Sequence, residues 1–207
     1  MKYGDELIEL HGTAVTIARF ISRATPAPLI NFYVGIIFSW LSPIGLGPIL
    51  TPMGSLLLCI VLMVIMPIAP IILEAIRGNV DLDVSKRESR TKFLLFSLLC
   101  YLLSFAVYTL LECVTMSSLA AAYFTVTMGV TIATLKTKVS VHGAGVGGPG
   151  TALIFVFGII AMPVVLVWAA VIWARIVLQQ HSLAQSLAGV LLGVIITALT
   201  YPFVYIY

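Results

Sequence analysis

Three polar stretches of this sequence carry the side chains that could do chemistry. Among these side chains are lysines, arginines, a serine and two histidines, namely Lys86, Arg87, Arg90, Lys92, Lys138, Ser140, His142, Arg175 and His181. Arginine presents a planar fork of donors that matches phosphate oxygens. The Gly-rich run GAGVGG (143–148) leaves backbone N–H groups free to approach an anion at the start of a helix. This collection suits a phosphate group better than a metal ion.

The two histidines of these stretches, His142 and His181, add reactivity to the cations. An imidazole is a competent nucleophile near neutral pH, and a covalent phosphohistidine divides hydrolysis into two easier displacements. The other imidazole could protonate the departing oxygen. The cations would stabilise the charge on the transferring phosphoryl group. These residue types therefore predict phosphoryl transfer.

The elements that position these groups are predicted to be membrane-spanning helices. Hydrophobic residues make up 61% of the 207 residues and charged residues 9%, and the mean hydropathy is +1.14. A soluble domain is roughly a quarter charged, so this chain cannot cover itself with a wettable surface. We therefore expect an all-α, polytopic helix bundle in a cell membrane, with the bilayer as its partner. The net charge of +3 (11 basic minus 8 acidic residues) is too small to indicate nucleic-acid binding.

Apolar runs long enough to cross a bilayer predict about six to seven spans. Residues 1–27 instead predict an interfacial amphipathic helix and a linker, because charges interrupt apolar residues that recur at helical spacing. Residues 28–207 are expected to form a single transmembrane domain, with a kink where Pro67 and Pro70 interrupt one run. The apolar runs are 29–41, 53–76, 93–111, 117–135, 151–174 and 186–207.

The run 151–174 has two interpretations. His142 and Arg175 are 33 positions apart, about 50 Å of helix, which is too long for one upright crossing of a core of roughly 30 Å. The run is either one long tilted helix with a proline kink or two short crossings that turn at Met162-Pro163. We favour the hairpin, because it brings Arg175 to the membrane face that the other basic loops share. The excess of Lys and Arg predicts that this face is cytoplasmic, although a phosphate site would gather cations on either side.

In their order, these stretches resemble the motifs of the type 2 phosphatidic acid phosphatase superfamily, integral membrane enzymes that remove phosphate from lipids without a metal. The family motifs are K-x6-R-P, P-S-G-H and S-R-x5-H-x3-D. ARIVLQQHSLAQ (174–185) matches the third, with Gln185 in place of Asp. KVSVHGAGVGG (138–148) keeps the Ser and His of the second and looks like the variant of small prokaryotic members. DLDVSKRESRTKF (81–93) has basic residues in the region of the first motif, but neither its spacing nor its proline.

The resemblance implies that His181 is the nucleophile and His142 the general acid. The phosphate cage that it implies consists of Arg175, Ser140 and one or two of Arg87, Arg90 and Lys92. Arg90 is preferred because it stands nearest the following span, and Lys138 is added here from its position two residues before Ser140. The expected activity is hydrolysis of a lipid phosphomonoester or diphosphate, such as an isoprenyl diphosphate or a phosphatidic acid-like lipid. Neither a metal nor a cofactor is expected.

Gln185 departs from the family pattern and has two compatible interpretations. In the family, the Asp at this place orients the nucleophile through its ring N–H. His181 and Gln185 are four positions apart, so they share a face if both are helical, and the Gln carbonyl oxygen can accept that proton. It supplies no charge, so a slower enzyme or a less basic nucleophile is expected. Alternatively, Ser182-x-x-Gln185 is a capping box that opens the last span.

Three other functions compete with the phosphatase. A non-catalytic relative would bind a lipid phosphate without turnover. Asp81-x-Asp83 would fit a Mg²⁺-dependent prenyl or phosphatidyl transferase, although such enzymes need a second cluster or a longer one. A haem held between His142 and His181 would need both histidines inside spans, and both are expected in polar loops.

Overall fold

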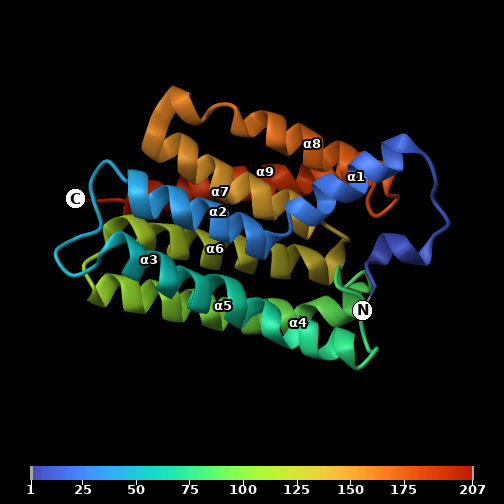
Figure 1. Cartoon of the computed structure of the whole chain (residues 1–207), viewed down its shortest axis with the longest axis horizontal. Coiled ribbons are helices and arrows are strands. Elements are labelled where there is room, and N and C mark those ends of the chain that lie inside the picture. Colours follow the sequence, from blue (N-terminus) through green and yellow to red (C-terminus); the bar gives the residue numbers. More distant parts are fainter. Residues whose placement is uncertain (1, 207) are drawn as a thin grey trace.

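Helices make up most of residues 2–206, the part that this computed structural model describes, and this part contains no strand. The long helices run side by side in an antiparallel bundle (Figure 1). The α-helices are α1 (Thr13–Ala24), α2 (Ala27–Leu41), α3 (Pro52–Cys59), α4 (Met66–Ile76), α5 (Arg87–Leu110), α6 (Val114–Lys136), α7 (Val141–Phe157), α8 (Val164–Val177) and α9 (Leu183–Val204). The shorter turns are η1 (Gly4–Leu7), the π-helical η2 (Ile60–Ile65) and η3 (Gly158–Ala161).

Five of the helical segments are long and apolar enough to cross a membrane: Pro52–Ile76, Arg87–Leu110, Val114–Lys136, Val141–Ala161 and Leu183–Val204. A sixth is counted if α1 and α2, which are bent by 59° at their junction, form one span. The expectation of an all-α, multi-pass membrane protein is therefore confirmed at this level.

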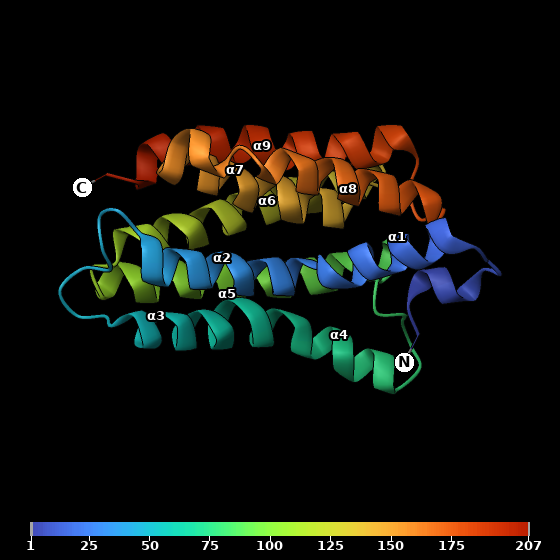
Figure 2. The same cartoon turned by 45° about the horizontal axis from the view of Figure 1, so that its top comes forward.

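The first long membrane segment is interrupted where the prolines predict a kink. Its middle, Ile60–Ile65, is π-helical and ends two residues before Pro67. Proline lacks an N–H and its ring clashes with the carbonyl one turn earlier, so the backbone here cannot keep a regular α-helical ladder. Figure 2 shows the helix axis changing direction between α3 and α4.

The chain reverses direction between α7 and α8. Gly158, which follows α7, has a φ of +64°, a conformation that favours glycine. The indole Nε1 of Trp168 in α8 donates to the carbonyl oxygen of Val146 in α7 at 2.9 Å. Residues 146 and 168 are each about 11 residues from the turn, which is the pairing of an antiparallel hairpin. The chain therefore folds back on itself within residues 151–174, as the favoured hairpin interpretation predicts.

One boundary of this hairpin differs from the expectation. Residues 143–148 were expected to be a Gly-rich loop, but they lie inside α7, which begins at Val141. The glycines allow α7 and α9 to pack closely: a Cβ on Gly147 would lie 2.4 Å from the carbonyl oxygen of Val190, and one on Gly189 would lie 2.4 Å from that of Ser140. Glycines are used in this way at close helix crossings in membranes.

The N-terminal segment is less regular than predicted. In place of one amphipathic helix up to Arg23, the turn η1 is followed by α1, which begins only at Thr13 after a Gly12 with φ of +115°. α1 buries Val15 and Ala18 against α8, while Phe20 is 73% exposed. This packing places α1 against the end of α8 that carries Arg175.

The charged loops meet at one end of the bundle. Because successive helices alternate in direction, the N-terminal segment and loops 77–86, 137–140 and 178–182 lie at the same end of the bundle. The C-terminus lies at the opposite end (Figure 1). Both predicted catalytic histidines are therefore at the same end: His142 in the first turn of α7 and His181 just before α9.

Candidate functional site

The carboxylate of Asp83 lies between two of the predicted site residues. Its Oδ2 is 3.6 Å from Nη1 of Arg175, and its Oδ1 is 4.0 Å from Nε2 of His142. Nη1 of Arg175 also donates to Oγ of Ser22 in α1 at 2.8 Å. Arg175 is 2% exposed, so its charge is held inside the protein.

Arg90, in the first turn of α5, is the second buried arginine, at 5% exposure. Its Nε donates to the carbonyl oxygen of Val84 at 2.7 Å, and its Nη1 donates to that of Val139 at 3.3 Å. The side chain thus ties the loop before α5 to the loop before α7. The charges of Arg90 and Arg175 act on the same two groups: both arginines lower the pKa of His181 and the pKa of Lys138.

His181 lies in the tight connection between α8 and α9. Its backbone N–H donates to the carbonyl oxygen of Arg175 at 3.3 Å, and its ring is largely buried. Nδ1 of the ring is 3.3 Å from Oε1 of Gln185. An amide oxygen only accepts, so this contact places the ring proton on Nδ1 and leaves the lone pair of Nε2 free.

Gln185 fulfils both interpretations of the sequence. Its Oε1 accepts from the backbone N–H of Ser182 at 3.2 Å, while the Ser182 hydroxyl accepts from the backbone N–H of Gln185 at 3.2 Å, which completes a capping box. The same Oε1 faces the ring of His181. One amide therefore starts α9 and orients the histidine.

Burial and the neighbouring cations keep His181 neutral. Burial is the largest cause, followed by the charges of Arg175 and Arg90, and together they lower the pKa of His181 to about 3, against a weaker opposing effect of Gln185. Burial and the same two arginines also lower the pKa of Lys138. The smaller part of both shifts, which Arg90 and Arg175 cause, reflects the positive charge of the site. At neutral pH the imidazole is in the unprotonated state that a nucleophile requires.

Ser140 stands at the start of α7 and is fully buried. Its Oγ accepts from the backbone N–H of Gly143 at 3.1 Å, which makes it the N-cap of the helix. Its own N–H donates to the carbonyl oxygen of Gln185 at 3.3 Å, so the starts of α7 and α9 are joined. The GAGVGG run does not form an anion loop as expected, because it continues the helix beyond this cap.

Two of the predicted phosphate ligands are not brought to the histidines. Nη1 of Arg87 donates to the carbonyl oxygen of Lys136 at 3.1 Å, at the exposed end of the bundle. The ammonium of Lys92 lies 4.8 Å from the centre of the Phe93 ring, and its charge acts on Glu74 near the end of α4. The site residues that share close or electrostatic contacts are Arg90, Lys138, His142, Arg175, His181 and Gln185.

Sequence reasoning missed the site positions of Asp83 and Ser22. Asp83 was considered only as a metal ligand together with Asp81, but Asp81 has a different role: its carboxylate accepts from the backbone N–H groups of Asp83 and Ser85 and so folds the loop. Ser22 reaches Arg175 only through the packing of α1 on α8, which no local pattern reveals. Within residues 2–206, no three His, Cys, Asp or Glu side chains are grouped so that they could hold a metal ion.

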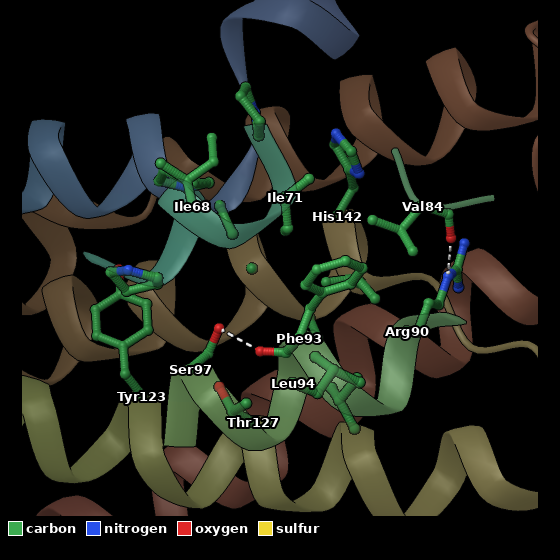
Figure 3. A pocket seen from close by; sticks show the side chains of 18 of the residues that line it. Ile68, Ile71, Val84, Arg90, Phe93, Leu94, Ser97, Tyr123, Thr127 and His142 are labelled. Carbon is green, nitrogen blue, oxygen red and sulfur yellow. Dashed lines mark hydrogen bonds between the residues drawn. The ribbon is translucent and has the colours of Figure 1, made fainter. Parts of the chain in front are cut away.

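An apolar cavity of about 160 Å³ opens beside the site. Its charged lining residues Asp83 and Arg90, together with His142, lie near one end, and the remainder comes mainly from apolar side chains of α2, α4, α5, α6 and α7. In Figure 3, Arg90 and His142 lie on one side of the cavity and Tyr123 lies on the other. Arg175 does not line the cavity, but it contacts Asp83, which does.

One hydrogen-bond donor of Arg175 is not used within the protein. Its Nε is buried and has no hydrogen-bond partner among the residues that the structure describes. An unpaired buried donor is costly, and more so on a charged group. An anionic oxygen bound at this place would satisfy it.

Comparison with known proteins gave no match: no family model fits the chain, and neither a curated protein nor a solved structure is significantly similar to it.

Proposed function

We propose that this chain is an integral membrane lipid phosphatase. It hydrolyses a lipid phosphomonoester or diphosphate through a phosphohistidine intermediate, without a metal. One observation carries the proposal: two buried guanidinium groups and a neutral imidazole share one site, and an apolar cavity leads away from it. The motifs that resemble the type 2 phosphatidic acid phosphatases support the same assignment.

The charges of the site support an anionic ligand. Arg90 and Arg175 are both buried, and Asp83 is the single carboxylate that touches either of them among the described side chains. Buried charges are costly unless they are paired. A phosphomonoester carries about −1.5 to −2 charges at pH 7 and would balance the remaining guanidinium and Lys138.

In the first step, Nε2 of His181 attacks phosphorus while Gln185 holds the Nδ1 proton. The bond between phosphorus and the lipid oxygen breaks, and that oxygen takes a proton from His142. Asp83, 4.0 Å from Nε2 of His142, places a negative charge beside this ring. The arginines stabilise the charge on the equatorial oxygens of the transition state.

In the second step, water attacks the phosphohistidine and the bond between phosphorus and nitrogen breaks. His142 takes a proton from that water and is thereby returned to its protonated form. Inorganic phosphate leaves, and His181 becomes neutral again. With a lipid diphosphate, the leaving group of the first step is the lipid monophosphate, and the rest is unchanged.

The placement in the membrane is part of the proposal. Helix α2, the segment α3–α4 and helices α5 to α9 give seven crossings, of which α8, with 14 residues, is the shortest. α1 lies at the interface, with the exposed Ile17 and Phe20 toward the lipid. The positive-inside rule places the site at the cytoplasmic face of a cell membrane.

The test is phosphate release from lipid mono- and diphosphates by the purified protein in detergent with EDTA. His181→Ala and His142→Ala should each lower the rate at least about 1000-fold, since each removes one of the groups that transfer the phosphoryl group or its proton. The matched control is His11→Ala, because His11 is exposed and has no part in the site. Full activity of the His181 variant would refute the mechanism, and an absolute requirement for Mg²⁺ would favour the transferase.

A second candidate is a lipid-phosphate-binding protein without turnover. It is favoured by Asp83, which already lies between Arg175 and His142 where a phosphate oxygen would lie, and by an uncharged Gln185 beside His181. This candidate predicts that lipid phosphates raise the Tm of the protein and that no phosphate is released from them.

A further inference from the structure

We infer that the apolar cavity holds one hydrocarbon chain of the lipid phosphate, and that Tyr101 and Tyr123 form the floor that limits its length. The inference rests on the proposed function, because the headgroup is placed at Arg90 and His142. It adds a substrate class: amphiphiles with a single chain no longer than the cavity.

The cavity follows one face of α5 and one face of α6. On α5, its lining residues recur at helical spacing: Arg90, Phe93, Leu94, Ser97 and Tyr101. The 11 residues from Arg90 to Tyr101 correspond to about 16 Å along the helix axis. On α6, which runs in the opposite direction, the lining residues are Val130, Thr127, Val126 and Tyr123. The cavity therefore has one long axis, with its charge at one end.

Two stacked tyrosines line the far end of the cavity. The rings of Tyr101 and Tyr123 have centroids 5.3 Å apart and an interplanar angle of 29°, and both residues are buried. Oη of Tyr101 accepts from Nδ2 of Asn31 at 3.2 Å, and the same nitrogen donates to the carbonyl oxygen of Met63 at 2.6 Å. These bonds fix the floor to α2 and η2, so a chain that reaches it must stop or turn aside.

The remaining wall is apolar and stiff. It includes Pro26, Pro28 and Pro67, whose ring structures restrict the backbone, and Ile68 and Ile71 of α4. A second charged group deep in the cavity would find no partner there. A single headgroup at Arg90 with one chain along α5 is the amphiphile that this lining matches.

The test measures binding of a homologous series of alkyl phosphates, from butyl to hexadecyl phosphate, by the rise in Tm of the purified protein. Each added methylene should strengthen binding about fourfold while it still enters the cavity, and the gain should stop once the chain reaches the floor. Phosphate release is recorded from the same samples.

Two kinds of variant change the cavity in opposite directions. Ser97→Trp places a large side chain midway along it and should weaken binding of decyl phosphate at least tenfold while leaving butyl phosphate unchanged. Thr127→Phe blocks from α6 and serves as a second plug if the first variant folds poorly. Tyr123→Ala should move the plateau to longer chains, and Tyr123→Phe, which keeps the ring, should not.

The matched control is Leu99→Trp, which puts the same side chain on the outer face of α5, where Leu99 is 65% exposed. Equal chain-length profiles for Ser97→Trp, Thr127→Phe and wild type would overturn the inference, as would an absence of any stabilisation by decyl phosphate. A profile that shifts in the plugged variants without phosphate release supports the chain site and refutes the phosphatase. Phosphate release with an unshifted profile supports the phosphatase and refutes the chain site.

Discussion

Replacing Gln185 with Glu tests the nucleophile directly, because it restores a charge beside His181 at almost constant shape. Oε1 of Gln185 is 3.3 Å from Nδ1 of the ring. A unit negative charge at this distance would stabilise the imidazolium by about 1 kcal/mol in a water-like medium and about 5 kcal/mol at an effective dielectric constant of 20. The helix cap is preserved, since Glu serves at this position of a capping box as well as Gln does.

The consequence is a change in the pH dependence. In the wild type, the pKa of His181 is about 3, so the nucleophile stays neutral throughout the usual assay range. In Gln185→Glu the pKa rises, and the acid limb of kcat/KM should move upward by about one pH unit or more. At pH 8, where the ring is still neutral, stabilisation of the developing positive charge should raise kcat about fivefold or more.

The assay is phosphate release from pH 4 to pH 9, with Gln185→Met as the comparison. Met keeps the length of the side chain but cannot accept from the ring, so kcat should fall while no new acid limb enters this pH range. Wild-type profiles in both variants would show that Gln185 acts only as the cap of α9, and the assignment of His181 would lose its support.

Four further outcomes are expected. Arg175→Lys should lower kcat/KM about 100-fold or more, because a lysine lacks the planar fork by which Arg175 contacts Ser22 and Asp83 through Nη1 and keeps Nε for a phosphate; phosphate release measures this. Asp83→Asn should lower kcat more than it raises KM if Asp83 supports the general acid, and should tighten phosphate binding if it is only an internal counterion. The Tm should fall as the pH decreases from about 6.5 toward 3, because the unfolded chain then binds a proton that the buried His181 does not, and His181→Gln should flatten that slope. Gly147→Ala should lower the Tm by several degrees, since its Cβ would meet a backbone oxygen at 2.4 Å, whereas Gly129→Ala meets only the flexible ends of the Ile196 and Leu192 side chains and should not.

The helices and the shared end of the charged loops follow from the sequence, because a run such as 93–111 must satisfy its backbone hydrogen bonds internally when it is in lipid. The start of α7 could not be predicted in this way. Gly143 and Gly147 have low intrinsic helix propensity, and their helix is stabilised by close packing against α9, which is a tertiary effect.

The residues of the candidate site likewise fall into those that the sequence predicts and those that depend on the fold. His142, Arg175, His181 and Gln185 are predicted from the motifs that the sequence resembles, and the structure brings them to one end of the bundle. Asp81 and Asp83 are only two positions apart in the sequence and cannot be told apart by their pattern. Their different roles depend on the fold of the loop, in which Asp81 accepts hydrogen bonds from the backbone and Asp83 contacts Arg175. Lys92 belongs to the basic cluster in the sequence, but the rotation of α5 turns it away from Arg90, which is two residues earlier.

The bond between Arg90 and the loop before α5 has a consequence for binding. Val84 has a φ of +45°, a conformation that costs a β-branched residue about 1–3 kcal/mol, and its carbonyl oxygen holds Nε of Arg90 at 2.7 Å. Immobilising a free arginine costs up to about 2 kcal/mol of rotamer entropy. Because folding has already immobilised this side chain, an arriving anion meets a preorganised guanidinium. If the loop at Val84 were loosened, the anion would have to order Arg90 as it binds, and its affinity would be lower.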